Sequence, residues 1–113
     1  MSDRRHIVSD KSMEQALDWL RDHAPEMGKA KERSVKAAHM VKHILHIEMK
    51  RSEEKTAAGK ERDAYASKAY EDAIEEDAKA AGALEVMRSL REAAALKIEA
   101  WRSEQANFRA MKI

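Results

Sequence analysis

Three histidines in the middle of the chain have a spacing that can bind a metal ion. His39, His43 and His46 stand at i, i+4 and i+7, which places them close together on a helix. Glu48 or Glu53 would supply a further ligand, but the sequence contains no His-Glu-x-x-His motif. The alternative is that these histidines line the border between an apolar helix face and solvent. We treat them as metal candidates and expect no resident metal ion or cofactor.

A run of carboxylates offers a second chemistry, acid–base catalysis. Its members are Glu71, Asp72, Glu75, Glu76 and Asp77. Catalysis would also need a cleft, a nucleophile or surroundings that raise a carboxyl pKa, and the sequence indicates none of them. Such a run is typical of a solvated acidic helix face. We therefore predict that the protein is not an enzyme.

The carboxyl-terminal segment mixes cationic and aromatic side chains. Such a mixture binds single-stranded nucleic acid, because the cations neutralise phosphates and the rings stack on bases. The alternative is that Trp101 and Phe108 anchor a helix core, and a net charge of only +1 favours it. The candidate interaction residues are Arg88, Arg91, Lys97, Trp101, Arg102, Phe108 and Arg109.

The composition limits the remaining possibilities. With no cysteine, the chain can form neither a disulfide nor a thiolate metal site. There is no run of about 18 apolar residues and no apolar signal-peptide core near Met1, so we expect a cytoplasmic protein without a membrane partner. Much of the 43% hydrophobic content is alanine, which buries little area. We therefore expect self-association, as a homodimer or higher oligomer, or a protein partner.

Helical periodicity predicts a single all-α domain over residues 1–113. No stretch alternates apolar and polar residues in the manner of a β-strand, so no strand is expected. A short amino-terminal helix should be followed by a long helical hairpin of coiled-coil type. The predicted segments are a flexible amino terminus over 1–11, helices over 12–23 and 26–51, a turn over 52–60 and a helix over 61–110.

Local signals set these boundaries. Ser12 and Gln15 match a capping box, in which each side chain satisfies a backbone N–H of the other. Pro25 lacks an N–H and disfavours helix at Ala24, so the first helix should end before it. Thr56 is the predicted N-cap of the last helix.

One heptad register runs through the last predicted helix. Its first position carries Ala66, Ala73, Ala80, Met87, Ala94, Trp101 and Phe108, and its second carries Tyr70, Asp77, Leu84, Arg91 and Ile98. Sustained spacing of this kind is typical of a helix that packs along a partner helix. Asp77 and Arg91 interrupt the second position. Either they fix the register or oligomeric state, by pairing between antiparallel chains, or they face solvent.

The closing residues 99–113 include Trp-Arg-Ser at 101–103 and Ala-Asn at 106–107. They resemble the end of a group of small phage and prophage proteins, which finish in a Trp-Arg-Ser, Asn-Ala-Asn-Arg pattern. Residues 12–18 and 64–67, together with Tyr70, are similar to other segments of those proteins. Gln105 and Phe108 depart from the pattern, which calls for asparagine and arginine. The resemblance implies a phage or prophage origin near replication and recombination genes, and no particular activity.

Two functions remain as expectations. The first is a phage-encoded accessory protein of the bacterial host cytoplasm that binds a phage or host protein through its helical surface. Its role would be in replication, DNA recombination or counter-defence. The second is a single-stranded nucleic-acid-binding protein that uses the carboxyl-terminal arginines and aromatic residues.

Overall fold

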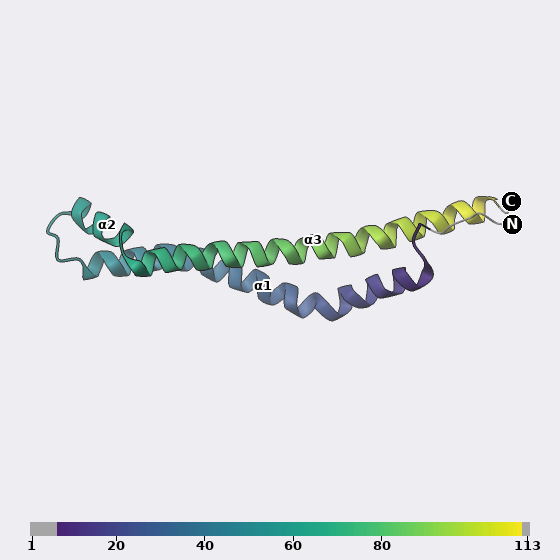
Figure 1. The fold of residues 1–113 in the computed structure, drawn as a ribbon, viewed down its shortest axis with the longest axis horizontal. Coiled ribbons are helices and arrows are strands. Elements are labelled where there is room, and N and C mark those ends of the chain that lie inside the picture. The colour runs from purple at the N-terminus through teal and green to yellow at the C-terminus, as the bar shows by residue number, and fades with distance from the viewer. Residues whose placement is uncertain (1–6, 112–113) are drawn as a thin grey trace. The chain divides into compact units, whose positions relative to one another are not determined.

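The computed structural model describes residues 7–111, and these form three helices without a strand (Figure 1). The helices are α1 (Asp10–Arg51), α2 (Ala57–Tyr65) and α3 (Lys68–Met111). The predicted all-α class is therefore confirmed. The chain packs into two units: a terminal unit of Met1–Met27 with Met87–Ile113, and a hairpin unit of Gly28–Val86. A single domain over residues 1–113 stays a prediction.

The predicted short first helix is wrong, because α1 continues through Pro25 as one helix of 42 residues. Pro25 has no N–H to offer the carbonyl of Arg21, so one backbone hydrogen bond is missing from the helix interior. Ending one helix and starting another would instead leave up to about four carbonyls and four N–H groups without helical partners. The continuous helix therefore loses fewer hydrogen bonds than the predicted break would.

The amino-terminal boundary of α1 also lies earlier than predicted. Ser9 is the cap: its Oγ accepts a hydrogen bond from the Ser12 N–H at 3.0 Å, and its carbonyl accepts from the Met13 N–H at 3.0 Å. The predicted capping box of Ser12 and Gln15 is therefore wrong, since Ser12 already lies inside the helix. Of the predicted flexible terminus, residues 1–6 lie outside the described residues.

The predicted helix over 61–110 is interrupted. Thr56 is confirmed as an N-cap, but of the nine-residue α2, where its Oγ1 accepts from the Gly59 N–H at 3.0 Å. A second cap, Ser67, starts α3: its Oγ accepts from the Tyr70 N–H at 3.2 Å and donates to the Ala64 carbonyl at 2.7 Å. A serine hydroxyl that bonds to nearby backbone competes with helical hydrogen bonding. The break follows from this competition, although the heptad pattern runs across it.

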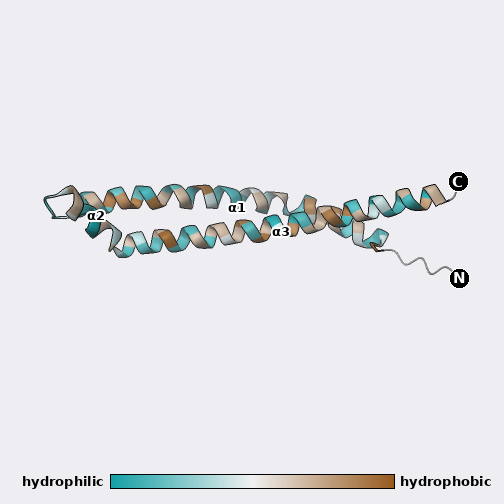
Figure 2. Cartoon of the chain, turned by 90° about the horizontal axis from the view of Figure 1, so that it is seen from above, coloured by the Kyte–Doolittle hydropathy of each residue, from teal (hydrophilic) through white to brown (hydrophobic). Residues whose placement is uncertain are grey.

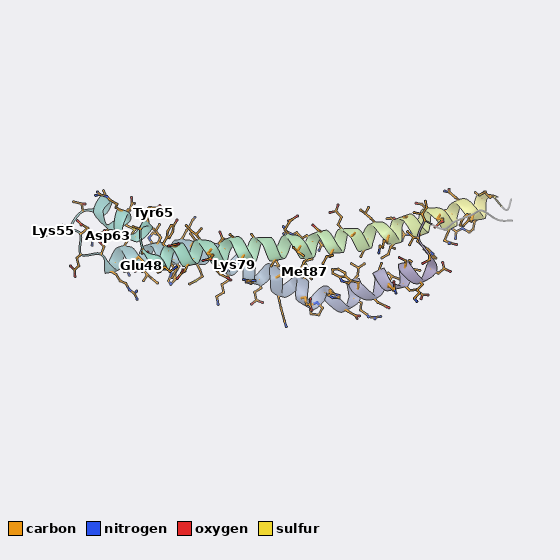
Figure 3. The ribbon with its side chains drawn as sticks, in the orientation of Figure 1. Glu48, Lys55, Asp63, Tyr65, Lys79 and Met87 are labelled. Carbon is orange, nitrogen blue, oxygen red and sulfur yellow. The ribbon has the colours of Figure 1, made fainter. Side chains whose placement is uncertain are left out.

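The turn of the hairpin unit is closed by α2 (Figure 3). The Ser52 hydroxyl donates to Asp63 at 2.6 Å, which joins the end of α1 to α2. Gly59 is buried, and a Cβ added there would lie 2.9 Å from the Cβ of Glu54. This close approach requires glycine. The rings of Tyr65 and Tyr70 meet edge to face at 5.1 Å across the break between α2 and α3.

Within the hairpin unit, α1 and α3 run antiparallel and face each other through residues spaced alternately three and four apart. The predicted heptad pattern is confirmed here, although Ala66 lies in the break. Figure 2 shows apolar residues recurring along both helices. The buried or half-buried positions at this spacing are Ala30, Ser34, Ala37, Val41, Ile44 and Glu48 on α1, and Tyr70, Ala73, Asp77, Ala80 and Leu84 on α3.

The terminal unit has the same antiparallel pairing of α1 and α3. Val8, Ala16 and Ala94 are buried, with half-buried methionine, leucine and aromatic side chains between them. Among the described residues of the chain, no side chain larger than alanine is fully buried. The core therefore rests mainly on close helix approach at alanine, and it buries little apolar area.

Candidate interaction surfaces

The start of the described chain is fixed to α3 by a carboxylate. The N–H groups of Ile7 and Val8 donate to the two oxygens of Glu104, at 2.9 and 3.4 Å, and both Val8 and Glu104 are buried. Nearby, Trp101 Nε1–H donates to Asp10 Oδ1 at 2.7 Å. Glu104 was missed from sequence because its backbone partners lie 97 and 96 residues away. No local pattern marks it.

The carboxyl-terminal candidates are divided between two faces of α3. Trp101 and Phe108 are half-buried at core heptad positions. Three exposed arginines, Arg88, Arg102 and Arg109, share the next heptad position, and Arg102 pairs with Glu99 at 3.2 Å. The structure therefore separates the rings, which lie along the helix contact, from the arginines on its flank.

An apolar groove of about 260 Å³ lies between α1 and α3 in the terminal unit. Trp19 of α1 and Leu90 of α3 are its largest apolar lining residues, and Leu90 is 47% exposed. Three of the lining residues are alanines, whose small side chains leave room for a large apolar side chain of another molecule. Lys97 carries the one charge among the lining residues, which are Gln15, Ala16, Trp19, Leu90, Ala93, Ala94 and Lys97.

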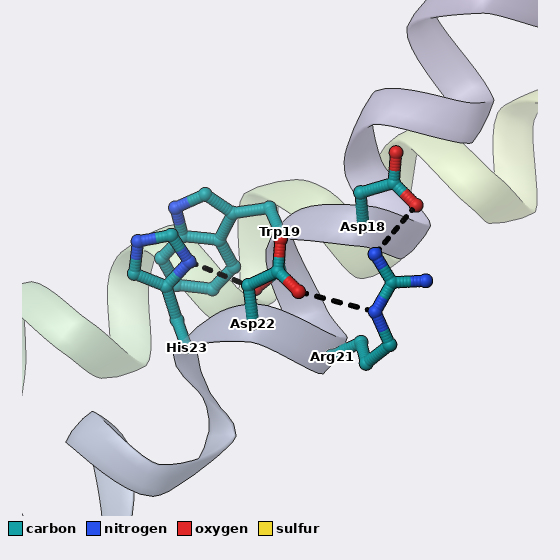
Figure 4. Close-up of polar contacts among 5 residues, drawn as sticks. All are labelled: Asp18, Trp19, Arg21, Asp22 and His23. Carbon is teal, nitrogen blue, oxygen red and sulfur yellow. Dashed lines mark hydrogen bonds and ion pairs between the residues drawn. The ribbon is translucent and has the colours of Figure 1, made fainter.

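Trp19 is held in place by its neighbours on α1 (Figure 4). Its ring stacks on His23 with centroids 4.4 Å apart and planes 12° apart. The His23 Nδ1 lies 2.9 Å from the Trp19 carbonyl oxygen, which fixes the imidazole. Trp19 and His23 also line a second hollow of about 140 Å³, together with the exposed Arg91. A preorganised aromatic wall of this kind is suited to binding a partner side chain.

Charges border this aromatic pair. Arg21 contacts Asp22 at 3.1 Å and Asp18 at 3.2 Å, all on the surface of α1 (Figure 4). The hydrogen bond and the negative charge of Asp22 raise the pKa of Arg21. The pairs lie in solvent, so they contribute little to stability.

The hairpin unit has a larger hollow of about 380 Å³, lined by both charged and apolar residues. Arg33 and Glu76 form a bidentate ion pair across it, which raises the pKa of Arg33 and lowers that of Glu76 through their mutual hydrogen bonds. The lining residues are Lys29, Glu32, Arg33, Lys36, Ala37, Met40, Ala73 and Glu76.

The histidines and carboxylates singled out from sequence lie mostly on the outside of the helices. His39, His43 and His46 are exposed on α1. Across residues 7–111, no three histidine, aspartate or glutamate side chains come together as metal ligands. Glu75 pairs with Lys79 at 3.2 Å, as part of an exposed acidic surface. Asp77 is half-buried against α1, and its pairing with Arg91 of another chain stays a prediction.

No described helix has both the length and the apolar character needed to cross a bilayer. Comparison of the chain with protein-family models, curated proteins and solved structures found no match.

Proposed function

We propose that this chain is a non-enzymatic interaction protein that binds a protein partner through the groove between Trp19 and Leu90. The observation that carries the proposal is the accessibility of this groove, which an ordered tryptophan, a half-exposed leucine and three alanines line. Tryptophan is enriched among the residues that dominate binding energy at protein interfaces. A helix that inserts one large apolar side chain would remove Trp19 and Leu90 from water.

The resemblance of the closing residues to small phage and prophage proteins supports a more specific role. On that basis the chain is an accessory protein in the cytoplasm of a bacterial host, acting in replication, recombination or counter-defence. Its partner is a phage or host protein, and the thin alanine core also favours association with a second copy.

Single-stranded nucleic-acid binding by the carboxyl-terminal segment is the competing proposal. Exposed Arg88 and Arg109 favour it, because they can reach phosphates. Trp101 is less suited to it, since its indole N–H already binds Asp10 and its ring is half-buried. Stacking on bases needs an accessible ring face.

Two leucines of α3 allow a matched test. Leu90→Glu places a charge in the groove, whereas Leu96→Glu makes the same change at a 63% exposed position outside its lining. Each full-length variant is used for affinity capture in 500 mM salt and with nuclease. Leu96→Glu should recover the same partner as the wild type, whereas the amount of partner recovered with Leu90→Glu should fall at least tenfold. Equal recovery of the partner by both variants would contradict the groove as the binding site. Loss of the wild-type complex on adding salt or nuclease would favour the nucleic-acid alternative.

A further inference from the structure

A row of basic side chains follows one stripe of α1 in the hairpin unit. Lys29, Lys36, His43 and Lys50 are each seven residues apart, and all four are exposed. We call this row the basic stripe. In the heptad it directly precedes Ala30, Ala37 and Ile44, which are buried or half-buried, so the row lies on the exposed border of the helix contact. Its first two lysines also line the hollow described above. His39, Lys42 and His46 are exposed beside it.

The chain's net charge of +1 conceals a strong separation of charge within this unit. Residues 28–51 carry seven Lys or Arg against two Glu, a net +5 with neutral histidines. Residues 68–86 of α3 carry two Lys against six Asp or Glu, a net −4. The basic stripe is also uncompensated: its three lysines form no ion pair with any residue that the structure describes.

We propose that the basic stripe binds the phosphate backbone of double-stranded nucleic acid, independently of base sequence. At about 1.5 Å per residue, the row from Lys29 to Lys50 spans about 32 Å, close to the roughly 34 Å of one turn of a DNA duplex. Successive positions of the row stand about 10 Å apart, and duplex DNA carries a negative charge about every 1.7 Å along its axis. Over that length the row crosses both sugar–phosphate strands of the duplex, so its lysines can contact phosphates where the strands pass.

The composition of this face favours a duplex over a single strand. Residues 28–51 contain no Phe, Tyr or Trp, so the stripe has no aromatic ring on which unpaired bases would stack. It offers lysine ammonium groups and imidazole N–H groups, which bind phosphate oxygens without reading bases.

Two other occupants fit this face less well. A helix that lies on an anionic membrane needs a wide apolar face, but Ala37, Val41 and Ile44 are turned into the hairpin contact. The acidic face of a second copy has the right sign of charge. Pairs between exposed side chains contribute little, whereas a nucleic acid adds the release of condensed counterions.

The inference is tested with the full chain and a fluorescent mixed-sequence duplex of 20 base pairs, by anisotropy between 50 and 200 mM salt. We expect micromolar binding at low salt that weakens about 40-fold over this range, as about three phosphate contacts predict. The triple variant Lys29→Glu, Lys36→Glu, Lys50→Glu should lose at least tenfold in affinity. A matched triple, Lys55→Glu, Lys68→Glu, Lys79→Glu, has the same net charge and should lose less than threefold.

Several results would overturn the inference. No wild-type binding at 50 mM salt would do so, as would equal losses in the two lysine triples, which would indicate only a general charge effect. If duplex affinity fell only in a third triple variant, Arg88→Glu, Arg102→Glu, Arg109→Glu, the binding site would lie in the carboxyl-terminal segment instead. Binding to phosphatidylglycerol vesicles without binding to duplex would assign the stripe to membranes. Because the groove variant Leu90→Glu leaves the stripe intact, it should bind duplex normally, which separates this inference from the proposed function.

Discussion

Arg33 donates hydrogen bonds from Nε and Nη2 to both carboxylate oxygens of Glu76, at 2.9 and 2.8 Å. This bidentate pair joins α1 to α3 in the hairpin unit and matches the planar guanidinium to the carboxylate. It differs from the exposed lysine pairs on α3, which link residues one turn apart within one helix. The Arg33–Glu76 pair therefore joins residues that lie opposite each other on the two helices.

Its contribution to stability should depend on pH. Arg33 lowers the pKa of Glu76 in the folded chain, chiefly through the hydrogen bond. The stabilisation is therefore fully present above the unfolded glutamate pKa of about 4.3 and is lost as pH falls through the lower folded value. Glu76→Gln should lower the melting temperature by no more than a few degrees at pH 7, and by nothing measurable at pH 2. Glu75→Gln is the control, and a larger effect there would contradict the assignment.

Close helix approach at alanine should make the core intolerant of larger side chains. Ala80 is 0% exposed between α3 and α1, so Ala80→Leu should destabilise the chain by about 1–3 kcal/mol through overpacking. Ala81→Leu makes the same change at the exposed neighbouring position and should be close to neutral. Urea unfolding followed by circular dichroism gives both values. Equal midpoints for the two variants would show that the helices are not in close contact at Ala80.

The carboxylate of Glu104 should control the order of the amino-terminal segment. Glu104→Ala removes the acceptor for the Ile7 and Val8 N–H groups. Because a hydrogen bond to a charged group contributes about 1.5–3 kcal/mol, exchange of these two amides should accelerate at least tenfold. Hydrogen exchange measured by NMR would show this, with the exposed Glu99→Ala as control. Unchanged exchange in Glu104→Ala would mean that the segment is held by other contacts.

Pro25 should be a net cost to α1. Replacing it with alanine restores an N–H for the Arg21 carbonyl, and we expect a gain of about 1–3 kcal/mol in the free energy of unfolding. Gly28→Ala is the reference, because an added Cβ meets nothing within 4 Å there. We expect it to raise the free energy of unfolding by about 1 kcal/mol. Chemical denaturation measures both. A destabilised Pro25→Ala would show that the missing hydrogen bond serves the fold.

The predictions that succeeded from sequence rest on repeated or local signals. The heptad spacing of Ala73, Ala80 and Leu84 predicted the helix contact, and Thr56 predicted a cap, because both depend on near neighbours. The predicted helix end before Pro25 was wrong because one missing hydrogen bond costs less free energy than the hydrogen bonds lost at two new helix ends. Ser67 was missed because the heptad pattern continues across it.

The interaction surfaces were harder to predict. The groove is lined by Trp19 and Leu90, which belong to different helices and lie far apart in sequence, so no local sequence pattern predicts it. The carboxyl-terminal arginines and rings looked like one mixed surface in sequence. They separate in space because each heptad position faces a different direction around α3.

The opposite charges of α1 and α3 in the hairpin unit also bear on how the protein will behave during purification. A chain with a net charge of +1 and uniformly mixed charges should pass through ion-exchange resins near neutral pH. Here a cation exchanger meets the lysines of α1 and an anion exchanger meets the carboxylates of α3. The protein should therefore be retained by both resins at low salt, and its elution will report the separation of charge rather than the isoelectric point.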